Sequence, residues 1–296
     1  MKKISLTAFA FLFCIYSNAQ NVGIGVPAPQ EKLDVNGNIN LNGDIKVSGA
    51  AGSANQVLMK DATNTLAWGD LSEYKNLRFF DCAGIASAAG ASNCNNTWTV
   101  PAGVTKVYVE VWGGGGGGGF GTGGSGAGYI VGKFVVTPSS SITITVGAGG
   151  NYGTETTNGI IGGISSVTYG AIVLTATGGE GGVRSQAAAF NPPAGGSFNA
   201  SGLTNYIGYY GTPGQVTTYA FNQINATEFA STTYFGNGGD AAMSPNSGGK
   251  GGYRLFSTPI YKDVNASTNA VNPGGGGGAD GGYGYYGRGG RVIIHW

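Results

Sequence analysis

The sequence predicts an all-β protein, on the basis of its glycine content, its strand-like segments and the lack of a helical period. Of the 59 glycines, 50 lie after residue 100, and seven of these are consecutive at residues 113–119. Because each glycine inside an α-helix costs about 1 kcal/mol relative to alanine, this stretch is not helical. Between the glycine clusters, apolar residues alternate with polar ones or are β-branched, which is typical of strands.

The first 19 residues have the features of a secretory signal peptide. Lys2 and Lys3 precede the apolar stretch SLTAFAFLFCIY, and small residues stand at the −3 and −1 positions of a cut after Ala19. The apolar stretch is too short to span a bilayer, so we expect no membrane insertion. The sequence therefore predicts a secreted protein, located in the extracellular space or on a bacterial cell surface.

The overall composition argues against charged partners. The formal net charge is +1, and only 10% of the residues are charged. Nucleic acids and anionic membranes are bound through basic patches, so we expect neither as a partner. The aromatic content of 11% also separates the chain from ordinary disordered tails, which are poor in aromatic residues.

Residues 20–71 are predicted to form a thin β stalk. Three short apolar–polar runs, KLDV, NINL and DIKV, are separated by Asn36-Gly37 and Asn42-Gly43, the residue pairs that two-residue type I′ turns require. Strands this short cannot bury a core of their own. An arrangement that resolves this is a homotrimer, in which three chains each contribute a β-ribbon to a shared axis.

Residues 72–96 are predicted to be a connector with two cysteines. Cys82 and Cys94 are the pair that remains after the signal peptide is removed. In an oxidising compartment, an even pair at this spacing favours a disulfide that closes a small loop. Two free buried thiols are the alternative.

Residues 97–296 are predicted to be a glycine-rich head domain. Strands are expected at residues 106–112, 129–136, 141–146, 172–176 and 291–296, and the last is expected to pair with the first. The run at 113–119 has two interpretations. It is either a flexible linker or an array of polyglycine II helices, which pack closely because no Cβ separates them. The return of glycine clusters between the strands favours the packed array.

Two parts of the chain resemble known families. NVGIG, KLDVNGNI and GSANQVLMKDATNTLAWGDL resemble the stalk repeats of bacteriophage tail fibres and related secreted bacterial surface proteins, which implies trimerisation. TVPAGVTKVYVEVWGGGGGGG, VTPSSSITITVGAGG and GGRVIIHW resemble the glycine-rich domain of phage tail-tip adhesins and bacterial surface proteins. The second resemblance implies a β-sandwich built around packed polyglycine II helices, with variable loops that contact a receptor.

The sequence gives little support for catalysis, a cofactor or a metal. Residues 119–124 fit GxGxxG, but a strand follows where a dinucleotide site needs a helix. His295 is the only histidine, so it is the only candidate base for a hydrolase triad, and it lies in the terminal strand. We therefore expect no catalytic residues, no cofactor and no metal site.

The candidate binding residues lie between residues 185 and 239, where Glu228 is the only charged residue. Aromatic residues are set there among Thr, Asn, Ser and Gly, as in paratopes, where tyrosine gives rigid contact area. The same composition also fits a sandwich core with long loops. The residues proposed to contact a receptor are Tyr206, Tyr209, Tyr210, Tyr219, Phe221 and Tyr234.

We therefore expect an adhesin-like protein that binds a surface glycan or a protein receptor through loops of its head, without catalysis. One alternative is a structural subunit of an extracellular filament or matrix, which would self-associate without a foreign ligand. A weaker alternative is ice binding, because a sustained Gly-x-x period is absent and Thr143-Ile144-Thr145 is only a short TxT array.

Overall fold

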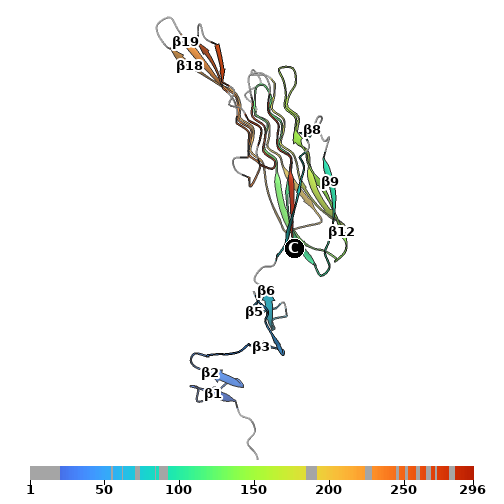
Figure 1. Ribbon diagram of the computed structural model, residues 1–296, viewed down its shortest axis with the longest axis vertical. Coiled ribbons are helices and arrows are strands. Elements are labelled where there is room, and N and C mark those ends of the chain that lie inside the picture. Colours follow the sequence, from blue (N-terminus) through green and yellow to red (C-terminus); the bar gives the residue numbers. More distant parts are fainter. Residues whose placement is uncertain are drawn as a thin grey trace, which may run out of the picture. The chain divides into compact units, whose positions relative to one another are not determined.

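The computed structural model describes residues 21–54, 56–61, 63–70, 74–83, 85–86, 93–184, 192–223, 229–244, 247–250, 253–257, 261–264, 268–270, 272–279 and 284–296. The predicted signal peptide lies outside these ranges. The described residues are all-β and contain no helix, and in particular no helix long and apolar enough to cross a membrane. The chain divides into two compact units, Met1–Ser72 and Glu73–Trp296 (Figure 1).

The first unit consists of three small two-stranded sheets. One is the parallel pair β1–β2, and the others are the antiparallel pairs β3–β4 and β5–β6. The strand bounds are β1 Val22–Ile24, β2 Leu33–Val35, β3 Lys46–Val47, β4 Ala50–Ala51, β5 Gln56–Lys60 and β6 Leu66–Asp70.

The prediction of type I′ turns at both Asn-Gly pairs is wrong. A type I′ turn needs positive φ at both central residues, and neither Asn36 nor Asn42 has one. The NINL run is also not a strand. The turn that has positive φ at both positions joins β3 to β4 through Ser48 and Gly49, with φ values of 50° and 86°.

The described part of this first unit leaves its large apolar side chains in solvent. None of its residues belongs to a buried hydrophobic cluster. The exposed apolar side chains are Val22, Ile24, Leu33, Ile39, Leu41, Ile45, Leu58, Met59 and Leu66.

The second unit contains a sandwich of two five-stranded sheets. The first sheet has the order β17-β11-β10-β22-β7 and the second the order β16-β15-β14-β12-β9. The bounds in the first sheet are β7 Leu77–Asp81, β10 Lys106–Trp112, β11 Tyr129–Val135, β17 Tyr206–Tyr209 and β22 Arg291–His295. Those in the second are β9 Cys94–Thr99, β12 Ser141–Val146, β14 Ser165–Tyr169, β15 Ile172–Ala176 and β16 Phe198–Ser201.

The core of the sandwich follows from strand alternation. In β10, Val107, Val109 and Val111 are fully buried, while the residues between them lie on the outer face. Ile142, Ile144 and Val146 of β12 fill the same core from the opposite sheet. The predicted pairing of the last strand with residues 106–112 is present, because β22 is antiparallel to β10 and pairs Trp112 with Arg291.

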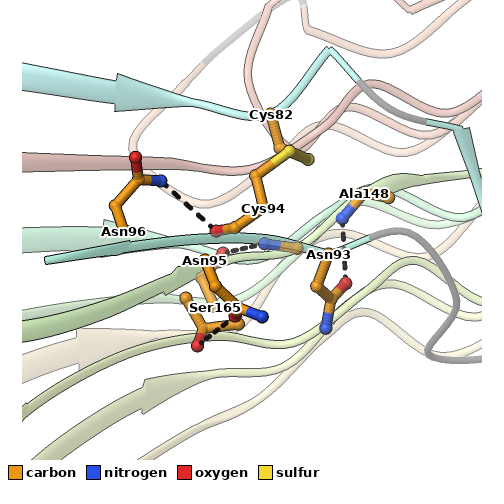
Figure 2. Close-up of a disulfide and its surroundings, with 9 residues drawn as sticks. Cys82, Asn93, Cys94, Asn95, Asn96, Ala148 and Ser165 are labelled. Carbon is orange, nitrogen blue, oxygen red and sulfur yellow. Dashed lines mark hydrogen bonds between the residues drawn. A yellow bond between two sulfur atoms is a disulfide. The ribbon is translucent and has the colours of Figure 1, made fainter.

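The stretch 72–96, predicted to be a connector, supplies strands of the sandwich instead. β7 pairs with β22 at one edge of the first sheet, and β9 pairs with β12 at one edge of the second. Cys82 and Cys94, which directly follow β7 and begin β9, are joined by a disulfide (Figure 2). A third short strand, β8 Ile85–Ala86, pairs in parallel with β13 Gly149–Gly150. This stretch is therefore part of the head.

The glycine run at 113–119 is packed backbone against backbone. Its N–H groups donate to three different segments in turn, with a period of three residues. Those of Gly113, Gly116 and Gly119 donate to residues 122–128, those of Gly114 and Gly117 to residues 160–163, and those of Gly115 and Gly118 to residues 285–288.

The carbonyl groups of the same run accept with the same period from three further segments. The oxygens of Gly114 and Gly117 accept from Gly179 and Gly182, those of Gly115 and Gly118 from Gly150 and Gly153, and that of Gly116 from Gly277. Six backbone segments therefore surround the run. These hydrogen bonds repeat every three residues, which is the period that the polyglycine II hypothesis requires. A run that is hydrogen-bonded on all sides in this way is not a flexible linker.

Two hairpins leave this glycine array and form a separate four-stranded sheet, which we call the tip sheet. Its order is β18-β19-β20-β21, with bounds Thr218–Gln223, Phe229–Tyr234, Tyr253–Ser257 and Tyr261–Val264. These strands adjoin three segments that are hydrogen-bonded within the glycine array, at 211–217, 235–240 and 247–250. In Figure 1, β18 and β19 lie at one end of the head, and β12 lies toward the other end.

Candidate functional site

The six aromatic residues proposed from the sequence fall into two groups. Tyr206 and Tyr209 lie in β17, the edge strand of the sandwich, and Tyr210 follows it. Their exposed fractions are 40%, 48% and 68%. Tyr209 stacks on Tyr129 with ring centroids 6.4 Å apart, so only part of its surface is available to a ligand.

The second group lies in the tip sheet. The register pairs Tyr219 with Thr233 and Phe221 with Ser231, so Tyr219 and Phe221 are on the same face of β18. Tyr234 pairs with Thr218, which places it on the opposite face, and it is half exposed. The structure therefore does not bring the six residues together into one surface.

The register collects other aromatic residues on the face of Tyr219 and Phe221. Ser231 pairs with Phe256, and Phe256 pairs with Tyr261, so both aromatic positions lie in the same row as Phe221. Phe229 pairs with Gln223 on this face as well. We call this set the aromatic tip face, and its positions are Tyr219, Phe221, Phe229, Phe256 and Tyr261.

Three members of the aromatic tip face were missed among the proposed residues: Phe229, Phe256 and Tyr261. The signal that could have found Phe256 and Tyr261 is the pair of short strand patterns YRLFS and YKDV, which follow the GGKGG cluster. Only the cross-strand register places these two on the same face as Phe221.

Residues 185–239, the range that holds the candidate binding residues, do not leave the glycine array as a single loop. Within that range, the Gly211 N–H donates to Gly196, and Thr212 accepts from the Gly126 N–H, so both segments belong to the array. A Cβ on Gly211 or Gly214 would overlap the carbonyl oxygens of Gly126 or Gly123. Of the described residues in this range, the hairpin β18–β19 is the part that forms the tip sheet.

The outer face of the first sandwich sheet carries a polar cluster centred on Glu110. Its carboxylate accepts from the Tyr129 hydroxyl (2.7 Å) and lies 2.9 Å from Nε2 of His295. Burial, and then the hydrogen bond to Glu110 and its charge, raise the pKa of Tyr129 above its usual value near 10. Burial and the charge of Glu110 also raise the pKa of Tyr108. The cluster joins β10, β11 and β22.

The GxGxxG pattern considered as a dinucleotide site acquires no further support. The GxGxxG segment at 119–124 lies within the glycine array, where the Gly119 N–H donates to Thr122, and β11 follows it. Among the described residues, no three His, Cys, Asp or Glu side chains are grouped as metal ligands would be.

Comparison with protein-family models gives a match to a family described as glycine-rich domain, over residues 87–296. The chain belongs to this glycine-rich domain family. The matched region begins before β9 and ends at Trp296, so it covers the second sandwich sheet, the glycine array and the tip sheet. A search of the curated proteins found no match.

Proposed function

We propose that the protein is a secreted, adhesin-like surface protein, whose glycine-rich domain binds a receptor through the aromatic tip face and performs no catalysis. The observation that supports this proposal is the register of the tip sheet, which puts five aromatic positions on one face of that sheet. Proteins commonly present a binding surface on a short segment that projects from a rigid framework.

The composition of this face favours a neutral partner with flat apolar surfaces. Besides the aromatic residues, its positions are Gln223, Ser231, Thr233, Arg254 and Asp263, and the last two are paired in register. Aromatic rings beside hydroxyl and amide groups suit sugar rings, and tyrosine and phenylalanine also supply rigid contact area to protein partners. We therefore propose a surface glycan as the first candidate receptor and a protein as the second.

The proposal includes a homotrimeric stalk formed by residues 20–71. Its support is the set of nine exposed apolar side chains in the first unit, of which Ile39 is 61% exposed and Leu33 59%. Contiguous exposed apolar surface on a soluble protein marks an interface, and burying it between three chains would supply the core that the short strands lack.

The first experiment tests binding by the aromatic tip face. Phe221→Ser and Phe256→Ser are introduced together, because the register places both positions in one row. We expect this double variant to lose binding in a glycan array and to intact target cells. Melting of the head should stay cooperative, because among the described strands β18 and β20 pair only within the tip sheet.

A matched control places two serines on the opposite face of the tip sheet. Asn222 and Leu255 lie on that face. Asn222 pairs in register with Ala230, and Leu255 pairs with Thr232 and Lys262. Asn222→Ser with Leu255→Ser should leave binding unchanged. Equal loss of binding in both double variants would contradict the assignment of the aromatic face, as would full binding by the first.

The group on β17 supplies a second comparison. Tyr206→Ser with Tyr210→Ser alters exposed side chains of the sandwich edge. If this variant loses binding while the tip-sheet variant retains it, the receptor contact lies at the sandwich edge and the tip-sheet proposal is wrong.

A second candidate function is a structural subunit of an extracellular filament or matrix. The observation that favours it is again the exposed apolar surface of the first unit. If that surface joins chains end to end rather than into closed trimers, the purified protein should form assemblies whose size grows with concentration, and the glycan array should give no signal.

A further inference from the structure

Two adjoining hollows flank Arg288 where the glycine array meets the sandwich. One has a volume of about 120 Å³ and is lined by Asn269, Tyr286 and Arg288 together with backbone of the array. The other has a volume of about 140 Å³ and is lined by Asp81, Asn272, Arg288 and Arg291. Both also touch Cys82 of the disulfide.

Arg288 is an exposed cation whose side chain has no partner among the described residues. Its backbone is fixed, because its N–H donates to Gly275 and its carbonyl accepts from Gly115. The charge of the neighbouring Arg291 is paired, since its guanidinium forms two hydrogen bonds to the Asp81 carboxylate, at 2.6 and 2.9 Å. Among the residues that line the hollows, two arginines and one carboxylate therefore leave one positive charge unpaired.

The other side chains around the hollows are rich in hydrogen-bond donors. The Asn269 oxygen accepts from the Tyr286 N–H at 3.0 Å, which leaves the amide nitrogen of Asn269 as a free donor. Asn272 is exposed beside Arg288. A planar guanidinium with neighbouring amide donors is the arrangement that proteins use for carboxylates, because the hydrogen bonds are charge-assisted.

The size of the hollows limits what they can hold. Small-molecule sites usually have volumes of roughly 300–1,000 Å³, and a water molecule takes about 30 Å³. Each hollow is thus large enough for one substituent of a larger ligand rather than for a whole ligand. Tyr286, whose ring packs edge to face on Tyr152 at 4.9 Å, gives the first hollow an aromatic wall, as sugar rings prefer.

We propose that the hollows beside Arg288 form a binding site for an acidic saccharide, with its carboxylate on Arg288 and its ring against Tyr286. The site is built by residues 81–83, 269–270, 272–273 and 286–291 and shares no residue with the aromatic tip face. It therefore does not depend on the receptor proposed for the tip sheet.

The test uses the full chain and saturation-transfer NMR with D-glucuronate, D-glucose and N-acetylglycine as probes. We expect D-glucuronate to bind, and D-glucose, which has the same ring without the carboxylate, to bind at least tenfold more weakly. Arg288→Gln should weaken D-glucuronate binding at least tenfold, because the charge and the fork of donors are lost. Cooperative melting should be unchanged, because Arg288 is exposed and its side chain forms no hydrogen bond or ion pair among the described residues.

Arg184→Gln is the matched control, because Arg184 is an exposed arginine that lines neither hollow. It should bind D-glucuronate like the unaltered chain. The proposal is overturned if D-glucuronate does not bind, or if Arg288→Gln binds it as well as the unaltered chain. Equal binding of N-acetylglycine and D-glucuronate would also overturn it, and would assign the hollows to a peptide carboxylate.

Discussion

Gly116 illustrates what the glycine array requires of a single residue. A Cβ at this position would overlap the carbonyl oxygen of Glu180, which is backbone and cannot rotate away as a side chain could. Because all six neighbours of the run are themselves held by hydrogen bonds, the overlap can be relieved only by separating packed segments.

We therefore expect Gly116→Val to lower the free energy of unfolding of the head by about 3 kcal/mol or more, the upper end of what overpacking costs. Thermal and denaturant melting measure this. Gly43→Val is the control, because Gly43 lies in open space, and it should leave the melting of the head unchanged. Unchanged melting of Gly116→Val would mean that the run is a linker.

Tyr129 predicts how stability depends on alkaline pH. Its pKa is raised in the folded protein by burial and by Glu110, whereas in the unfolded chain it titrates near 10. Above pH 10 the unfolded state loses this proton while the folded state keeps it, so stability falls as the pH rises, by up to about 1.4 kcal/mol per pH unit for one proton. The contribution is fully present below pH 10.

Tyr129→Phe should therefore flatten the loss of stability between about pH 10 and pH 11, as measured by urea melts across that range. It should also destabilise the protein at neutral pH, because the hydrogen bond to Glu110 is lost. A variant with the same alkaline slope as the unaltered chain would show that other groups cause the dependence.

At the scale of elements, β22 holds the sandwich together. It lies between β10 and the edge strand β7 in the first sheet, and Val292 and Ile294 are fully buried in the core. A chain that ends at residue 290 should therefore lose cooperative melting. Replacing residues 218–234 with a short Gly-Ser link should keep it, because that hairpin pairs only within the tip sheet among the described strands. Circular dichroism melts compare the two.

Five strands, β10, β11, β12, β15 and β22, could be predicted from the sequence within one residue of their bounds. Their apolar residues either alternate with polar ones, as in β10 and β12, or include β-branched runs, as in β22. β7 was not predicted, because its apolar residues Leu77 and Phe79 are exposed. Buried and exposed residues therefore do not alternate along this strand.

The candidate site was predicted less well, for a physical reason. Aromatic residues suit a core and a binding surface equally, so composition located the region but not the face. Tyr219 and Phe221 could be proposed from their neighbourhood, but Phe256 joins them only through pairing with Ser231, about 25 residues away in the chain. The hollows at Arg288 combine residues from three distant segments and have no local signature.

At the scale of the whole molecule, the first unit determines the assembly that we propose. Light scattering of residues 20–296 should give about three times the mass of the chain, because the exposed apolar side chains of the stalk need partners. Leu33→Ser with Ile39→Ser should shift the protein toward monomer. A monomer at micromolar concentration for the unaltered chain would contradict the trimer, and the head alone is not required to associate.

The central claim is that the glycine run at 113–119 is an ordered scaffold that carries the tip sheet. Amide hydrogen exchange of these seven residues tests it most directly, because all seven are buried and each N–H donates to a backbone carbonyl. We expect their exchange to be slowed as strongly as that of Val109 in the centre of the sandwich. Exchange at the rate of an unstructured chain would contradict the claim, and with it the presentation of the tip sheet by a rigid head.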